Sequence, residues 1–140
     1  FAELGRAMGF FDQLFSGAKR EPQKPSSLEM ELRQRLTVLA GDNATSSVPQ
    51  RYFLRWEGQV QGVGFRFNNT NLAQARSLTG WVRNMEDGSV EMEVQGTPAN
   101  ILSHLEALHA SYERMGIRFC LKKAQLRTPL ADEDGFSPRY

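Results

Sequence analysis

The chain has 140 residues, 40% of them hydrophobic and 24% charged, so it can hold one ordinary globular domain with some additional chain but not a second full domain. Basic and acidic side chains are balanced, with six of each in residues 1–50 and eleven against ten in residues 51–140. This balance excludes a global field that would draw the protein to nucleic acid or anionic lipid, so any anion site must be local.

The cysteine and apolar content argue against a disulfide-stabilised secreted protein, a zinc module and a membrane-spanning protein. A single cysteine, Cys120, cannot form an internal disulfide, and no Cys/His cluster has the spacing of metal ligands. No run approaches the ~18 apolar residues of a membrane span, and residues 1–18 lack the order of a secretory signal. We therefore expect a cytoplasmic protein with no metal site and no membrane span. Met8 is a candidate natural start, which would make residues 1–7 a remnant of an expression vector.

The first 50 residues are interpreted as an N-terminal extension. Apolar residues recur at helical spacing over residues 2–17, and a Pro-containing polar stretch, Ser16–Ser27, follows as a linker. Ser26 and Glu29 form a predicted capping box for a second short helix that runs to Ala40.

The domain boundary is predicted in the polar, turn-forming stretch that precedes residue 51. Because short isolated helices are marginal in water, two interpretations of residues 1–50 stay open: two short helices joined by linkers, or a partly disordered tail with transient helices. Its candidate roles are a tether, an oligomerisation segment or a membrane-surface helix. No oligomeric state is predicted.

From residue 51 onwards the pattern of strands and helices is dense. In chain order we predict a strand over 52–60, a helix over 65–77, a strand over 81–84, a strand over 90–95, a helix over 98–112, a strand over 117–127 and a short edge strand over 135–140. The order strand, helix, strand, strand, helix, strand is the split βαβ arrangement. The expected fold class of residues 51–140 is therefore α+β, a ferredoxin-like sandwich with two helices on one face of an antiparallel sheet.

The segment Gly58–Arg66 (GQVQGVGFR) leads from the first predicted strand into the first predicted helix and is suited to an anion. Its glycines let the backbone approach a ligand, and a helix N-terminus adds partial positive charge. Arg66 can bind two phosphate oxygens in a fork that a lysine does not reproduce. The alternative is an ordinary tight turn with an exposed arginine, because a Gly-x-Gly pair is a weak signal alone.

Asn84 ends the second predicted strand, just before the hairpin turn Glu86–Ser89. Its amide both donates and accepts, so it can hold a water beside a phosphate bound at the first loop. An asparagine before a hairpin is also a common turn residue, and from the residues alone both interpretations stay open.

Three segments together resemble the two signature regions of the acylphosphatase family: GQVQGVGFR at 58–66, GWVRN at 80–84 and DGSV at 87–90. They occur in the family's order and spacing. The resemblance covers about residues 51–140, including the final Arg139-Tyr140. It implies the ferredoxin-like fold that the element order predicts independently.

The resemblance also implies residue roles. Arg66 matches the family's phosphate-binding catalytic arginine, and Asn84 matches its water-orienting asparagine. The loop whose backbone amides cradle the phosphate is matched by Gln61, Gly62, Val63, Gly64 and Phe65, followed by Arg66. The implied reaction is hydrolysis of an acyl phosphate to a carboxylate and inorganic phosphate, with no metal and no cofactor. Because these contacts grip the phosphoryl end, acetyl phosphate, carbamoyl phosphate, 1,3-bisphosphoglycerate and protein aspartyl phosphates are all candidate substrates.

Two features depart from the family's pattern. Trp56 stands where the family more usually has a smaller aliphatic residue, and the run Asn68–Asn71 is more polar than the family's first helix. This run predicts a weak first helical turn. His104 and His109 lie five residues apart on the second predicted helix, so they do not share a face, and we expect both at the surface or its boundary.

Two other functions are weighed against hydrolysis. Ferredoxin-like sheets also bind RNA, but there the aromatic motif occupies the third strand, which here carries Glu91 and Glu93 and would repel an anion. We therefore expect no nucleic-acid partner. The second alternative is an inactive domain that binds a phosphorylated metabolite or protein, because a fold does not establish an activity.

Overall fold

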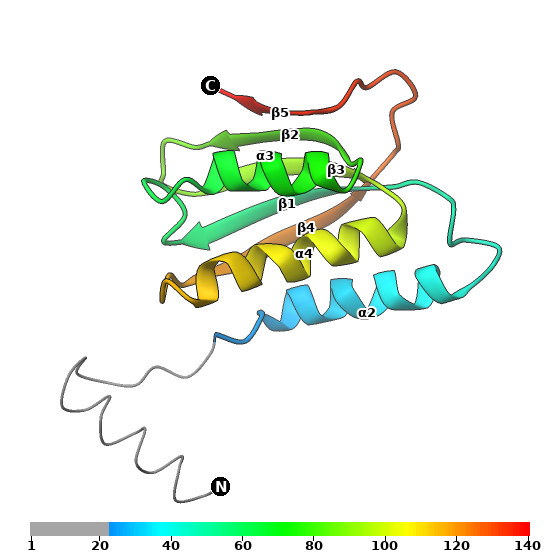
Figure 1. The fold of residues 1–140 in the computed structure, drawn as a ribbon, viewed down its shortest axis with the longest axis horizontal. Helices are drawn as coiled ribbons and strands as arrows, with labels where there is room; N and C mark the ends of the chain where they lie inside the picture. Colours follow the sequence, from blue (N-terminus) through cyan, green and yellow to red (C-terminus); the bar gives the residue numbers. More distant parts are fainter. Residues whose placement is uncertain (1–22) are drawn as a thin grey trace, which may run out of the picture.

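The structure, a computed structural model, describes residues 23–140; the helix predicted over residues 2–17 and the possible vector remnant lie outside this range. The elements in chain order are α2 (Ser27–Gly41), β1 (Gln50–Gly58), α3 (Phe65–Ala75), β2 (Thr79–Asn84), β3 (Val90–Gly96), α4 (Pro98–Glu113), β4 (Phe119–Arg127) and β5 (Phe136–Arg139) (Figure 1).

The five strands form one sheet in the order β4-β1-β3-β2-β5. The central strand β1 pairs antiparallel with β3 and with β4, and β2 pairs antiparallel with β3. β1 and β2 therefore run in the same direction, and their C-terminal ends lie at the same edge of the sheet. The short β5 adds a parallel edge beside β2. The five-stranded sheet with its helices confirms the predicted α+β, ferredoxin-like fold class.

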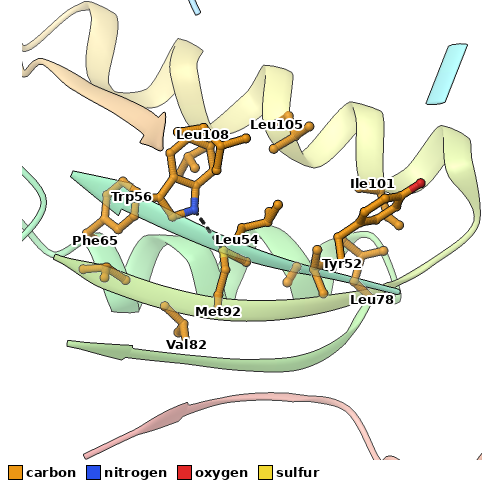
Figure 2. Close-up of a cluster of buried hydrophobic side chains, with 14 of the residues drawn as sticks. Tyr52, Leu54, Trp56, Phe65, Leu78, Val82, Met92, Ile101, Leu105 and Leu108 are labelled. Carbon is orange, nitrogen blue, oxygen red and sulfur yellow. Dashed lines mark hydrogen bonds between the residues drawn. The ribbon is translucent and has the colours of Figure 1, made fainter. Parts of the chain in front are cut away.

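The hydrophobic core lies between the sheet and the helices α3 and α4, which cover one of its faces (Figure 1). Period-two alternation buries every second residue of β1, so that Leu54 and Trp56 face the helices with no exposed surface. Trp56 donates its indole N–H to the sulfur of Met92 at 3.2 Å on β3 (Figure 2). The tryptophan that departs from the family's pattern is thus a fully packed core residue.

The helix α2 packs against α4 and β4 at the edge of the sheet (Figure 1). Leu32 and Leu36, from the predicted apolar stripe, are buried in the common core. Ser26 caps the helix as predicted by accepting from the Glu29 N–H at 3.2 Å. The Glu29 carboxylate does not close the predicted capping box, because it bonds to Arg33 and His109 instead. The second short helix is therefore confirmed over Ser27–Gly41, and its packing on the domain is a finding of the structure.

The last strand, β5, is held in place by polar contacts and by one core residue. Phe136 enters the core, and its carbonyl accepts from the Gln74 side chain at 3.1 Å. Just before β5, Glu133 receives two hydrogen bonds, of 2.6 and 3.0 Å, from the buried guanidinium of Arg51. These contacts set the path of the chain end that reaches the site described below.

One expectation about polar residues is wrong, and the surroundings of a second polar run are now defined. His104 is fully buried, not at the surface, and its Nε2 lies 3.0 Å from Asn69 Oδ1. The Asn68–Asn71 run lies within α3, which is helical from Phe65; the expected weakness of its first turn stays a prediction. Asn69 is buried and donates to the Phe65 carbonyl at 2.9 Å, which satisfies its amide inside the helix layer.

Candidate active site

The candidate site lies where β1 and β2 end. Because these parallel strands are separated in the sheet only by β3, the loop that leaves β1 and the last residue of β2 reach the same edge. The Gln61 side chain joins them by donating to the carbonyls of Met85 and Ser89, at 2.7 and 2.9 Å. The loop and the β2–β3 hairpin are therefore fastened together beside Asn84.

Two glycines give the loop its shape. Gly62 and Gly64 have φ angles of 76° and 72°, in the left-handed region that favours glycine. Gly64 is the N-cap of α3 and has no side chain with which to bond the first helical turn. Within residues 23–140, the backbone N–H groups of residues 61–67 find no hydrogen-bond acceptor. The unpaired N–H groups of the loop and of the first turn of α3 are thus candidate donors to an anion.

The loop is also supported from the core. Tyr112, near the end of α4, donates its hydroxyl to the Val63 carbonyl at 3.2 Å. Burial raises the pKa of Tyr112, which keeps this hydroxyl protonated and donating. At the start of the loop, the Gln59 N–H donates to the Arg118 carbonyl, and its side-chain oxygen accepts from the Arg118 N–H, each at 2.8 Å.

Arg66 lies at the N-terminal turn of α3 and is half-buried. Its guanidinium carbon is 4.4 Å from the centre of the Tyr140 ring, a cation–π contact, and its Nη1 donates to the Arg139 carbonyl at 3.2 Å. The remaining guanidinium N–H groups have no acceptor within the described chain. They are available for the two-oxygen contact predicted from the sequence.

Asn84 presents an unsatisfied acceptor. Its Oδ1 is buried and has no hydrogen-bond partner among residues 23–140. A buried amide oxygen without a partner is costly by about 1–3 kcal/mol, which favours a bound water or ligand at this point. The interpretation of Asn84 as a simple turn residue does not account for this oxygen.

A cleft of about 490 Å³ brings these groups together. Of the sequence-predicted residues, it is lined by Gly62, Gly64, Phe65, Arg66 and Asn84. Gln61 and Val63 do not line it: the Gln61 side chain bonds to the hairpin, and Val63 packs against the core. Further lining residues that the sequence reasoning missed are Val60, Phe67, Thr70, Asn71, Gln74, Pro138 and Tyr140.

The charge of this cleft is simple. Among its lining residues in the described chain, Arg66 is the only charged one, and none is Asp, Glu or His. Among these side chains an anion therefore meets one cation and no carboxylate, and none of them is a strong general base. Elsewhere in residues 23–140, no three His, Cys, Asp or Glu side chains gather so as to hold a metal ion. In the same range, no helix has the length and apolar character needed to cross a bilayer.

The model of one protein family, described as Acylphosphatase, matches residues 52–137. The chain belongs to the acylphosphatase family. The matched range contains the whole loop, α3, β2 and Asn84, so the family resemblance drawn from the two motifs is confirmed.

Individual relatives agree with this family. An acylphosphatase of Synechococcus sp. (strain CC9902) is 34% identical over 116 residues, covering 77% of this chain and 96% of that protein. An acylphosphatase of Geobacillus kaustophilus is 52% identical over 54 residues, 39% of this chain, and the match spans only 57% of that relative's own length. The crystal structure of the acylphosphatase from Bacillus subtilis superposes with a TM-score of 0.52 at 29% identity, covering 65% of this chain and 99% of that one.

Proposed function

We propose that this protein hydrolyses acyl phosphates to a carboxylate and inorganic phosphate. The observation that carries the proposal is the convergence, in one cleft, of unpaired loop amides, a fork-shaped cation and an unsatisfied amide oxygen. The family membership supports it. The expected natural setting is the cytoplasm, and the expected small-molecule partners are an acyl phosphate and inorganic phosphate.

The phosphoryl group is bound by the loop and by Arg66. Backbone N–H groups from Gln61 to Phe65 donate to its oxygens, and the guanidinium of Arg66 binds two of them. These donors are fixed before the substrate arrives, because the loop is fastened to the hairpin and to Tyr112. Preorganised donors stabilise the charge that spreads over the phosphoryl oxygens in the transition state.

The attacking water is oriented by Asn84. Its Oδ1 accepts a hydrogen bond from the water, which directs the water oxygen towards phosphorus. A new P–O bond forms as the bond between phosphorus and the acyl oxygen breaks, and the acyl group leaves as a carboxylate. The water's proton passes to the phosphate or to the departing carboxylate. No strong base is needed, because the leaving group is a stable carboxylate.

The direct test is hydrolysis of benzoyl phosphate in EDTA by the wild type, Arg66→Ala and Asn84→Ala, with circular dichroism to confirm folding. We expect rapid metal-free turnover by the wild type and a loss of about 10²- to 10³-fold in each variant, since each removes a preorganised group. Arg114→Ala and Asn43→Ala, two exposed positions outside the cleft, are matched controls that should retain activity.

Inorganic phosphate provides a second readout. It should inhibit competitively, because it occupies the same donors as the phosphoryl group. A folded wild type that binds phosphate without turnover would support an inactive phosphate-binding domain instead. If phosphate had no effect on the kinetics of an active wild type, the placement of the phosphoryl group in this loop would be wrong.

A further inference from the structure

The helix α2 lies outside the segment that matches the family model, yet it is tied to the strand that borders the catalytic loop. Ahead of the helix, the Gln23 side chain accepts from the Phe119 N–H at 3.0 Å and donates to the Phe119 carbonyl. Ser26 donates to the Leu121 carbonyl at 2.8 Å. These bonds cover the outer edge of β4 where it begins, one residue after Arg118, the backbone partner of Gln59 at the start of the loop.

A buried carboxylate forms the second connection, between α2 and α4. Glu29 has no exposed surface, and its two oxygens bond to different partners: Oε2 to Arg33 at 2.7 Å and Oε1 to His109 Nε2 at 2.6 Å. Burying a charge is costly unless it is paired and hydrogen-bonded, so this geometry is specified rather than incidental. Arg33 also donates to the Leu105 carbonyl at 3.4 Å, on α4.

From His109, ring contacts lead directly to the loop. The His109 ring stacks on Phe119, with centroids 4.6 Å apart, and Phe119 in turn lies 5.3 Å edge-to-face from Phe65. Phe65 is the first residue of α3 and stacks on Tyr112 at 5.7 Å, the residue whose hydroxyl holds the Val63 carbonyl. Close-packed rings do not deform continuously, so a change in the position of His109 is passed on to its neighbours.

We infer that Glu29 is a positioning residue for the phosphate-binding loop. It fixes the ring of His109, and through the aromatic cluster of Phe119, Phe65 and Tyr112 it holds the loop and the first turn of α3 in their anion-binding conformation. The helix α2 thus helps to hold the phosphate-binding loop in place, in addition to packing against the domain. The inference rests on the proposed function only in that this loop binds phosphate; it does not require turnover.

The test measures the dissociation constant of inorganic phosphate by isothermal titration calorimetry, well below each variant's melting temperature. Glu29→Gln removes the charge and replaces one acceptor oxygen with a donor NH2, so that either Arg33 loses its acceptor or His109 must accept a hydrogen bond at Nε2 in place of donating one. We expect phosphate binding to weaken by about three- to tenfold, which lies within the range of coupling through packed networks. His109→Gln should weaken it similarly. The controls Glu31→Gln on α2 and Glu106→Gln on α4 are exposed and should leave it unchanged.

The double variant Glu29→Gln/His109→Gln completes the experiment. If Glu29 acts through His109, the double variant should weaken phosphate binding no more than either single variant does. If the two residues act independently, the two fold-changes should multiply. A purely structural role would lower the melting temperature of Glu29→Gln and leave phosphate affinity unchanged, and that result overturns the inference. If Glu29→Gln does not fold, unchanged phosphate affinity in a folded His109→Gln overturns it equally.

Turnover and binding separate this inference from the proposed function. A wild type that binds phosphate but does not hydrolyse benzoyl phosphate would refute the hydrolase while the comparison of Glu29→Gln with Glu31→Gln still decides the role of α2. A wild type that does not bind phosphate at all would refute the role of the loop and this inference with it.

Discussion

Arg66 is held before any ligand arrives. Its guanidinium lies against the Tyr140 ring and donates to the Arg139 carbonyl, so part of the rotamer freedom that a long arginine would lose on binding is already lost. A cation–π contact of this kind contributes about 0.5–1 kcal/mol at an exposed site. The arrangement therefore lowers the entropic cost of forming the fork around a phosphoryl group.

His104 shows how a single buried residue gives the protein a dependence on pH. Burial, assisted by the charge of the nearby Arg76, lowers the pKa of His104 to about 4. In the unfolded chain the pKa is near 6.5, so between pH 6.5 and about 4 the unfolded state binds a proton that the folded state does not. Stability from this group is complete above pH 6.5 and is lost as the pH falls through this range.

We therefore predict that the free energy of unfolding, measured with urea between pH 7 and 4.5, falls more steeply for the wild type than for His104→Gln. The full effect of the shift from 6.5 to about 4 is about 3 kcal/mol. Gln retains a donor for Asn69 Oδ1 but does not titrate. The Asp and Glu side chains titrate in both proteins, so their contribution cancels in the comparison. Parallel stability curves would show that His104 does not remain neutral in the fold.

Residue-level features were the hardest to anticipate from the sequence. That Arg66 and Asn84 line one cleft is in keeping with the family resemblance and with the predicted strand order, which brings the ends of β1 and β2 together; their chemical roles stay predictions. The pairing of His104 with Asn69 did not follow from the sequence, because a polar residue on an apolar helix face gives no sign of its partner 35 positions away. The contacts of the Glu29 carboxylate could not be predicted for the same reason, because its partner His109 comes from α4, 80 positions along the chain.

Among the elements, the loop from β1 to α3 carries the site, and its conformation depends on glycine. A Cβ at Gly64 would meet no atom within 4 Å, so a larger side chain is not excluded by lack of space. It is the backbone φ angle of 72° that favours glycine here. Placing an L residue in the left-handed region costs about 1–2 kcal/mol. Part of that strain can be relieved by distorting the loop, which would disorganise the anion-binding amides.

We predict that Gly64→Ala lowers the free energy of unfolding by about 1–2 kcal/mol and also weakens phosphate binding. The matched control is Gly41→Ala at the end of α2, where a Cβ again meets nothing within 4 Å and φ is not positive. There, alanine should preserve or slightly raise stability, since it favours the helix. Equal effects at the two glycines in urea unfolding would contradict the conformational argument.

Element boundaries illustrate what periodicity can resolve. The alternation of Val90, Met92 and Val94 located β3 correctly, because each apolar residue faces the core. The start of β2 was predicted at Trp81, two residues late, because Gly80 has no side chain to continue the pattern. Gly80 nevertheless pairs with Val94, and a Cβ there would lie 1.9 Å from the Glu93 carbonyl oxygen, so only glycine fits this ladder position.

At the scale of the whole molecule, α2 belongs to the same core as the sheet. The sequence predicted the helix from its leucine stripe but could not tell docking from exposure, since an amphipathic stripe only shows that one face seeks a partner. We predict that Leu36→Ala lowers the free energy of unfolding by about 2–5 kcal/mol, as for any fully buried leucine.

Val38→Ala is the matched control for Leu36→Ala, because Val38 is 61% exposed on the same helix. It should change the free energy of unfolding by no more than about 0.5 kcal/mol in the same urea titration. A loss at Leu36 as small as the loss at Val38 would mean that α2 is only loosely associated with the sheet in solution.

The position of β1 between β3 and β4 has a consequence for how the protein is made. Arg55 of β1 pairs with Glu91 on one side and with Lys123 on the other, so the second neighbour lies far along the chain. At roughly 5–20 residues per second, the roughly 70 residues between Arg55 and Lys123 take about 3–14 s to synthesise. During that interval one edge of this central strand has no partner, and an unpaired edge is a template for another chain. Aggregation during synthesis should therefore begin at β1, and the risk should persist until β4 has left the ribosome and paired with β1.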